Sequence, residues 1–272
     1  MSRAASAPLV IGAIRYLNSR PLTMALPTVA ASARIVYDVP SRLADGVAGG
    51  RIDVALLPSI ECFRHADYTA VSDVCVASRG PVRSVKLFSR VPLDRVNSVA
   101  LDEGSRTSAA LTQIILRERF ERRPRVEPLP LGARLDTLRA DAVLLIGDRC
   151  LQTRPPGYKE QHDLGELWTA WTGLPMVFAL WLARASAPLE GLAEILSAAR
   201  DEGLARLSEI AAADGPRLGL TIEDCLGYLR DTLRYQLGPR EHEALRLFHA
   251  YAVKHQLAPR GAGLVFYPSP VG

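Results

Sequence analysis

The sequence predicts an α/β protein in which short parallel strands alternate with helices. Two observations indicate this class. Apolar runs at residues 9–14, 34–39 and 52–57 have the length and composition of buried strands. Between the second and third runs, residues 41–49 show the helical spacing of apolar side chains and end at a glycine pair. Strand, helix and strand at this short spacing are typical of parallel sheets.

A second unit of the same kind begins at residues 98–102. This apolar strand is followed by a polar segment that contains glycine, and then by a helical pattern. Ser105, Thr107 and Ser108 stand at the break, where helix N-caps belong. The start of a helix, with N–H groups that lack partners, binds anions readily, and Arg106 adds a full positive charge. The alternative is a plain helix cap that holds no ligand.

The rest of the pattern continues the alternation and then becomes helical. The expected further strands are residues 74–77, 82–88, 126–129, 141–146 and 176–182. The expected further helices are residues 163–171, 188–213, 221–235 and 239–256. Residues 261–272 are rich in glycine and proline and are expected to lie on the surface.

We expect these elements to form two α/β lobes. Residues 52–59 and residues 140–148 echo each other, because each segment has an aspartate, a short apolar strand and a small polar tip. The expected division assigns residues 1–88 and 178–272 to lobe one and residues 89–177 to lobe two. Two crossings of the chain between lobes favour a hinge with a cleft beside it.

Polar residues gather where the predicted strands end. In parallel sheets ligands bind at the carboxyl ends of strands, so these residues are the first candidates for a site. They are Asn18, Ser19, Arg20, Ser59 and Asp148, with Ser84 inside the strand expected at residues 82–88.

Composition narrows the classes of function. The 272 residues are 48% hydrophobic and 23% charged, which is typical of a soluble globular protein. The net charge of +4 is scattered, and the basic segment at residues 117–125 alternates with glutamate. A solvated helix end explains that segment better than nucleic-acid binding does. No membrane segment and no signal peptide are predicted.

The four cysteines lie far apart in the sequence and form no CxxC motif, so no metal site is predicted. Four free thiols suit a reducing compartment, and we expect a cytoplasmic protein. The sequence does not distinguish a monomer from a homodimer.

Six motifs occur in an order that resembles one known family. They are YLNSRPL at residues 16–22, RIDVALLPSIE at 51–61, GPVRSVKLFS at 80–89, LDEGSRTSAAL at 101–111, LLIGD at 144–148 and DLGELWTAWTGLPMVFALW at 163–181. Together they resemble the chorismate dehydratases of the futalosine-type menaquinone pathway. The match covers residues 9–184. Met176 replaces the phenylalanine expected in many members.

The resemblance implies a fold like that of type II periplasmic solute-binding proteins, with an interlobe cleft. It also implies a hydro-lyase reaction in which chorismate loses water to give 3-[(1-carboxyvinyl)oxy]benzoate, without a metal or redox cofactor. The expected partner is therefore this small-molecule substrate, with neither nucleic acid nor a membrane.

Site roles follow as hypotheses. Asn18 is expected to hydrogen-bond the reacting hydroxyl or the ether side chain of chorismate. Ser105, Arg106, Thr107 and Ser108 would bind one carboxylate, and Ser59 and Ser84 the other from lobe one, with Ser19 and Arg20 beside them. Asp148 would act as a base or would only cap a neighbouring loop. No histidine lies in a matched motif, so a carboxylate of chorismate itself is a candidate proton acceptor.

Each assignment has a structural alternative. Asn18 and Ser19 could cap a helix, Ser59 could close a turn, and Ser84 could be a buried hydroxyl with a partner inside the protein. Arg20 and Arg106 could be surface charges or could pair with acidic side chains. Two other functions also fit the sequence: a small-anion binding protein without catalysis, and the related enzyme that cyclises a futalosine derivative.

Overall fold

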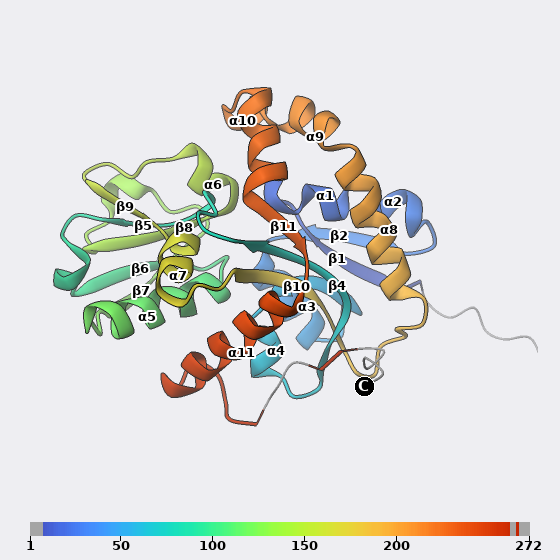
Figure 1. Cartoon of the computed structure of the whole chain (residues 1–272), viewed down its shortest axis with the longest axis horizontal. Helices are drawn as coiled ribbons and strands as arrows, with labels where there is room; N and C mark the ends of the chain where they lie inside the picture. Colours follow the sequence, from blue (N-terminus) through green and yellow to red (C-terminus); the bar gives the residue numbers. More distant parts are fainter. Residues whose placement is uncertain (1–7, 262–264, 267–272) are drawn as a thin grey trace, which may run out of the picture.

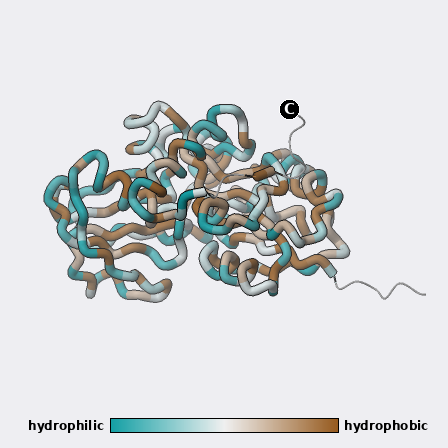
Figure 2. The backbone as a smooth tube through the Cα atoms, turned by 90° about the horizontal axis from the view of Figure 1, so that it is seen from below, coloured by the Kyte–Doolittle hydropathy of each residue, from teal (hydrophilic) through white to brown (hydrophobic). Residues whose placement is uncertain are grey.

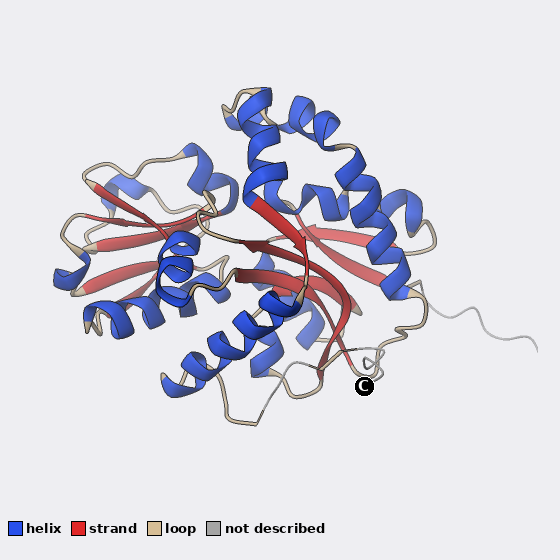
Figure 3. Cartoon of the chain, viewed as in Figure 1, coloured by secondary structure: helices blue, strands red, loops and turns tan. Residues whose placement is uncertain are grey.

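The computed structural model describes residues 8–261 and 265–266. It contains two β-sheets side by side, each covered by helices (Figure 1). The strands lie inside the two layered bodies and the helices outside them (Figure 3). The predicted two-lobed α/β architecture is therefore confirmed.

The larger sheet has six strands in the order β11-β4-β10-β3-β1-β2. These strands are β1 (Val10–Ile14), β2 (Arg34–Asp38), β3 (Val54–Pro58), β4 (Tyr68–Ser78), β10 (Met176–Arg184) and β11 (Leu233–Gln236). Strand β1 pairs in parallel with β2 and β3, whereas β10 is antiparallel to both β3 and β4. Every residue of β3 is buried, as expected for a central strand covered on both faces.

The smaller sheet has five strands in the order β7-β6-β8-β5-β9. These strands are β5 (Val85–Ser89), β6 (Ser98–Asp102), β7 (Arg125–Leu129), β8 (Ala142–Ile146) and β9 (Glu160–Asp163). Strand β6 pairs in parallel with β7 and β8, and β5 is antiparallel to β8 and β9.

The two sheets share one plan. The order β2-β1-β3-β10 in the first corresponds to β7-β6-β8-β5 in the second, with three parallel strands and then an antiparallel one. The echo in the sequence falls on the equivalent strands β3 and β8. The aspartates of the two segments have the same structural role, because Asp53 accepts a hydrogen bond from Val10 N–H and Asp141 accepts one from Ser98 N–H. Each carboxylate therefore fixes the start of the neighbouring parallel strand.

Helices cover both sheets. Those of the larger body are α1 (Arg20–Thr23), α2 (Leu26–Val29), α3 (Pro40–Ala48), α4 (Glu61–Arg64), α8 (Leu192–Ala205), α9 (Leu207–Asp214), α10 (Ile222–Gly227) and α11 (Pro239–Lys254). Those of the smaller body are α5 (Thr107–Phe120), α6 (Gly147–Gln152) and α7 (Leu164–Thr172). Helix α11 also packs against α5 of the smaller body, and α6 approaches the turn that follows α9 (Figure 1).

The chain passes between the sheets twice, after β4 and before β10. The division expected from the sequence placed residues up to 88 in lobe one. The pairing of β5 with β8 and β9 instead places Val85–Ser89 in the second sheet, so the first crossing lies between Ser78 and Val85. An isolated antiparallel strand pattern does not reveal its partner, because pairing is a tertiary choice.

Three other local predictions were wrong in detail. The helix expected at 221–235 ends at Gly227 and continues as a π-helical turn, after which residues 233–236 form the edge strand β11. The helix expected at 188–213 is two helices, α8 and α9, that meet at Arg206. Strand β9 was not predicted, since its polar residues lack an alternating apolar pattern.

The buried core consists of apolar residues of the strands and of the helices that cover them. Hydrophobic segments, drawn in brown, run through both bodies (Figure 2). Trp168 and Trp181 are fully buried, which supports a core role for them. All four cysteines are buried and free. No described helix is long and apolar enough to cross a membrane. Of the expected surface tail, residues 262–264 and 267–272 lie outside the described residues.

Candidate functional site: a cleft between the two sheets

A cleft of about 50 Å³ lies where the carboxyl ends of parallel strands from both sheets meet. The larger body contributes the segment after β1 and the end of β3, and the smaller body contributes the segments after β6 and β8. Its lining residues are Ile14, Tyr16, Asn18, Pro40, Pro58, Val76, Val85, Ser105, Thr107, Ser108, Ile146, Gly147, Phe178 and Ala179. None of these lining residues carries a charged side chain. The site thus combines an apolar wall with hydroxyl, amide and backbone groups.

The start of α5 supplies most of the hydroxyls. Ser105 lies two residues before Thr107, the first residue of α5. Its Oγ accepts a hydrogen bond from Ser108 N–H at 3.1 Å and so caps the start of the helix. Ser105, Thr107 and Ser108 all line the cleft. Helix α5 is the longest in the smaller body, and its N-terminal dipole favours an anion at this point.

Thr107 joins the two bodies. Its Oγ1 accepts a hydrogen bond from Ile60 N–H at 3.2 Å and lies 3.3 Å from Ser59 Oγ. Ser59 itself is fully buried and donates from Oγ to the carbonyl of Val177 at 2.7 Å. The structure therefore brings Ser59 next to the cleft but behind Thr107, where it closes a turn and positions the threonine.

Asn18 lines the cleft from a 3₁₀ turn, Leu17–Ser19, that follows β1. The neighbouring Ser19 does not reach the cleft: it is buried and its Oγ donates to the carbonyls of Ile14 and Tyr16. Ser19 thus stabilises the turn that presents Asn18, and its side chain makes no capping hydrogen bond to helix α1, which was the alternative considered for it.

Arg106, expected to bind substrate, holds the two bodies together instead. Its guanidinium donates to Glu61 at 2.9 Å and to Asp45 at 2.5 Å, and both acids belong to the larger body. Glu61 is only 1% exposed and also pairs with Arg64. Arg20 likewise pairs with an acid, Asp214, at 2.8 Å. Neither arginine lines the cleft.

Ser84 is another buried hydroxyl with a partner inside the protein. It is fully buried, and its Oγ accepts a hydrogen bond from Tyr228 Oη at 2.7 Å. Its carbonyl accepts from Gly147 N–H at 2.8 Å, so Ser84 is bonded to both bodies, through Tyr228 to the larger and through Gly147 to the smaller. Burial raises the pKa of Tyr228 far above its usual range, so the phenol stays protonated and donates.

Asp148 follows Gly147 at the end of β8 but faces away from the cleft. Its Oδ1 accepts a hydrogen bond from Leu17 N–H at 2.8 Å. Burial raises the pKa of its carboxyl, and the charge of Asp214 raises it further, while the Leu17 N–H bond lowers it. The sequence left a base and a loop cap open for Asp148, and this contact is that of a cap.

Sequence reasoning missed three contributors to the cleft region. Tyr16 and Phe178 both line the cleft, although each reads in the sequence as an ordinary core aromatic. Asp102, at the end of β6, is buried and accepts a hydrogen bond from Gly104 N–H at 2.9 Å. Burial raises the pKa of Asp102, and burial with the charges of Asp102 and Asp148 raises that of Tyr16. The position of Asp102 at a strand end was a signal that could have found it.

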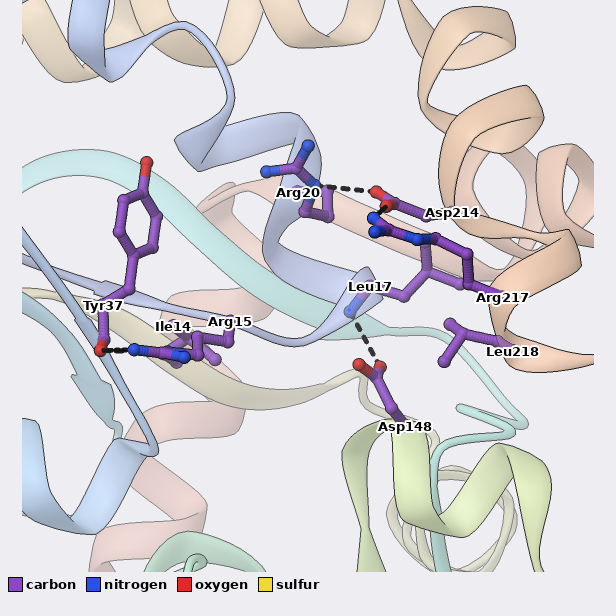
Figure 4. Close-up of a pocket in the computed structure, with 9 residues that line it drawn as sticks. All are labelled: Ile14, Arg15, Leu17, Arg20, Tyr37, Asp148, Asp214, Arg217 and Leu218. Atoms are coloured by element: carbon purple, nitrogen blue, oxygen red, sulfur yellow. Dashed lines mark hydrogen bonds and ion pairs between the residues drawn. The ribbon is translucent and has the colours of Figure 1, made fainter.

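A much larger groove of about 610 Å³ lies beside the cleft (Figure 4). Its lining residues are Ile14, Arg15, Leu17, Arg20, Tyr37, Asp148, Asp214, Arg217 and Leu218. Figure 4 shows its charged side chains already paired: Arg15 with the carbonyl of Tyr37, Arg20 with Asp214, and Asp148 with Leu17 N–H. Within the described residues, no group of three or more His, Cys, Asp or Glu side chains is placed to hold a metal ion.

The comparison with protein families shows to which family the chain belongs. A family described as menaquinone biosynthesis matches residues 9–254. The chain belongs to this family. The match extends through the helical C-terminal third, beyond the motifs at residues 16–181, and confirms the resemblance drawn from them.

Two curated relatives of this chain are chorismate dehydratases. A chorismate dehydratase of Thermus thermophilus is 34% identical over 285 residues, covering 96% of this chain and 99% of the relative. A chorismate dehydratase of Campylobacter jejuni is 27% identical over 177 residues, covering 63% of this chain and 66% of the relative.

Solved structures confirm the predicted fold. A protein of Archaeoglobus fulgidus superposes with a TM-score of 0.73 at 15% identity, covering 93% of this chain and 100% of that one. The periplasmic aliphatic sulphonate-binding protein SsuA of Escherichia coli gives a TM-score of 0.60 at 17% identity, covering 94% and 89%. At such identities the likeness concerns the fold, which is that of periplasmic binding proteins.

Proposed function

We propose that this member of the menaquinone biosynthesis family is a chorismate dehydratase, a hydro-lyase that forms 3-[(1-carboxyvinyl)oxy]benzoate and water. The observation that carries the proposal is the composition of the cleft. Asn18 from one body lines the same cleft as the hydroxyl-rich start of α5 from the other, in a chain 34% identical to a chorismate dehydratase along nearly its whole length.

The cleft suits a dianion that must be held in one pose. One carboxylate of chorismate would bind at the start of α5, where Thr107 and Ser108 offer hydroxyls and the helix dipole is favourable. The apolar wall that includes Pro58 and Phe178 would contact the ring. Asn18 would hydrogen-bond the reacting hydroxyl or the ether side chain. Such groups catalyse by orientation and by fixed dipoles rather than by a strong acid or base.

The reaction breaks the C–H bond at the ether-bearing ring carbon and the C–O bond of the neighbouring hydroxyl. The proton and the hydroxide leave as water, and the ring becomes aromatic, which drives the reaction forward. No charged side chain lines the cleft among the described residues, and Asp148 is engaged by Leu17 N–H. These two facts support the hypothesis that a carboxylate of chorismate itself accepts the proton.

The direct test is to mix purified protein with chorismate and to follow the aromatic product by absorbance and mass spectrometry. We expect product at a rate proportional to enzyme concentration, and a rate reduced at least 100-fold in Asn18→Ala. If chorismate binds and is not consumed, the protein is a small-anion binding protein. If only a futalosine derivative is converted, the protein is the cyclising enzyme.

An Asn18→Ala variant that binds and converts chorismate at the parental rate would remove Asn18 from the mechanism. The cytoplasmic location and the monomeric or homodimeric state expected from the sequence stay predictions. Cell fractionation and light scattering of the purified protein would measure them.

A further inference from the structure

Two short segments from opposite bodies dock against each other beside the cleft. One is Tyr16–Leu17, after β1 of the larger sheet, and the other is Gly147–Asp148, after β8 of the smaller sheet. Figure 4 shows the Asp148 carboxylate directed at the backbone of Leu17 from across the seam. The two groups are 131 residues apart in the sequence, so only the approach of the two bodies creates this contact.

The docking is close at two points. Asp148 Oδ1 accepts from Leu17 N–H at 2.8 Å, which is the length of a good charge-assisted hydrogen bond. The ring of Tyr16 lies over Gly147, where a Cβ atom would come within 2.7 Å of it. Gly147 also has φ of +59°, a conformation that favours glycine. The segment after β8 is therefore shaped to receive the segment after β1.

The contact bears directly on Asn18. Leu17 is the first residue of the 3₁₀ turn that contains Asn18, and its side chain is buried. A hydrogen bond to the Leu17 N–H therefore fixes the position of the first residue of this turn. Ser19 fixes the other end of the turn through its bonds to Ile14 and Tyr16. Without Asp148 the first end of this turn loses its hydrogen bond to the other body and keeps only the packing of Tyr16 on Gly147.

The size of the cleft shows why such an anchor matters. About 50 Å³ is far below the roughly 300–1,000 Å³ of pockets that enclose small organic ligands. A ligand of that size can therefore enter only if the walls of the cleft move apart. Separation of the two bodies would break a hydrogen bond across the seam, and closing would restore it together with the position of the Asn18 turn.

We propose that Asp148 is a positioning residue: in the closed form its carboxylate holds Leu17 N–H and thereby places Asn18 against the substrate. This inference rests on the proposed function for its catalytic consequence, but not for its structural one. The sequence leaves open that Asp148 is a general base, and positioning is a different role. The two roles give different results in the same pair of variants.

The kinetic test compares Asp148→Asn with Asp148→Ala. An asparagine at this position keeps an oxygen that can accept the Leu17 N–H, but it has lost the ability to take a proton at neutral pH. We expect D148N to retain kcat within about fivefold of the parent, and D148A to lose about 100-fold in kcat, the scale that misplaced catalytic groups cost. Loss of kcat in D148N as large as in D148A would overturn the proposal in favour of a base.

A double variant tests whether Asp148 acts through Asn18. If it does, N18A/D148A will be no slower than N18A alone, because the side chain that Asp148 places is already absent. Multiplied losses would mean that Asp148 acts independently of Asn18 and would overturn the proposal. Asp141→Ala serves as the matched control, since Asp141 also accepts backbone N–H groups but within the smaller body. We expect D141A to keep kcat within about threefold, with all assays run below each variant's melting temperature.

A second measurement needs no substrate. Amide hydrogen exchange of the peptide that spans residues 16–20 should be at least tenfold faster in D148A than in the parent, and near the parental rate in D148N and D141A. Unchanged exchange in D148A would overturn the proposal whatever the activity. If exchange responds as expected but no variant or parent converts chorismate, the positioning contact stands and the proposed function fails.

Discussion

The two neighbouring cavities of this protein differ in size and in chemistry. The cleft has about 50 Å³ and is lined by hydroxyls, an amide and apolar side chains, whereas the groove beside it has about 610 Å³ and three arginines. Size and charge alone would select the groove as the site for a dianion. The groove's charges, however, are already paired within the protein, while the cleft has the strand ends of both sheets and a helix start.

The proposed function places a dianion in a cleft whose described lining residues include no cation. Paired surface charges are well solvated and gain little from a ligand. Backbone dipoles and hydroxyls in a closed, apolar setting act more strongly, because the effective dielectric constant is lower there. The following predictions test this difference, beginning with the change of largest expected effect.

Gly147→Ala should cost at least 100-fold in kcat/KM. The added Cβ would meet the Tyr16 ring at 2.7 Å and would also strain a residue with φ of +59°. The seam could then not close, and Asn18 would be misplaced. Steady-state kinetics with chorismate measure the effect.

Gly173→Ala is the matched control, because Gly173 has φ of +71° and a Cβ there would meet nothing within 4 Å. It should lose only the backbone cost of about 1–2 kcal/mol in stability and keep its activity. Equal losses of activity in both variants would show that backbone strain, rather than closure of the cleft, is responsible.

Thr107→Val should reduce kcat/KM by about 10- to 100-fold and destabilise the fold by about 1–3 kcal/mol. The substitution keeps the shape but leaves the buried Ile60 N–H without its acceptor. Urea unfolding and kinetics measure the two effects, and Thr107→Ser should restore most of both.

Thr112→Val provides the comparison within the same helix. Thr112 is equally buried, but its Oγ1 donates to the carbonyl of Ser108 and does not line the cleft. We expect a loss of about 1 kcal/mol in stability and unchanged kcat/KM. A T112V variant as inactive as T107V would indicate that α5 matters only as a packed helix.

Arg106→Met should lower the free energy of unfolding by about 2 kcal/mol and raise KM about tenfold. It removes a guanidinium that joins the bodies and leaves Glu61, which is 1% exposed, with Arg64 and His65 as its remaining partners. The double variant E61Q/R106M should regain part of the stability. An increase in KM without any loss of stability would instead place Arg106 on the substrate, as the sequence suggested.

The buried acid under the cleft should make stability depend on pH. Burial raises the pKa of Asp102, so the neutral acid is favoured in the folded state. Below about pH 4, the pKa of an aspartate in the unfolded chain, Asp102 is neutral in both states and the folded state keeps its full stability. The folded state loses stability as pH rises from there through the higher pKa of the folded state, because the buried carboxyl must then ionise. Asparagine resembles the neutral acid, so D102N should gain stability relative to the parent as pH rises from 4 to 7 in thermal unfolding. A constant difference across that range would contradict the prediction.

Changes in the groove should have the smallest effect. Arg15→Gln and Arg217→Gln remove charges that are exposed or paired within the protein, so kcat/KM for chorismate should change less than about twofold. A loss of tenfold or more in kcat/KM that disappears when salt is added would show that the groove guides the substrate to the cleft. The groove would then share with the cleft in recognising the substrate.

Much of the fold could be predicted from the sequence, because local signals were strong around the cleft. The strands β1, β3, β6 and β8 and the start of α5 were predicted from apolar runs and hydroxyl-rich breaks, and Asn18, Ser105, Thr107 and Ser108 all line the cleft. The site could not be read completely. Ser19, Ser59 and Ser84 have the same residue type as the lining serines, and their burial behind the cleft depends on contacts distant in the sequence.

The sequence by itself determined the two repeated strand–helix units, their shared aspartates and the hydroxyl-rich start of the helix at residue 107. These features depend on hydrophobic period, capping and turn residues, which are local properties of the chain. Only the tertiary structure decided that β5 belongs to the second sheet, that Arg106 pairs with Glu61 and that Asp148 holds Leu17. Such choices depend on which groups meet when two bodies close on each other, and no local pattern records that.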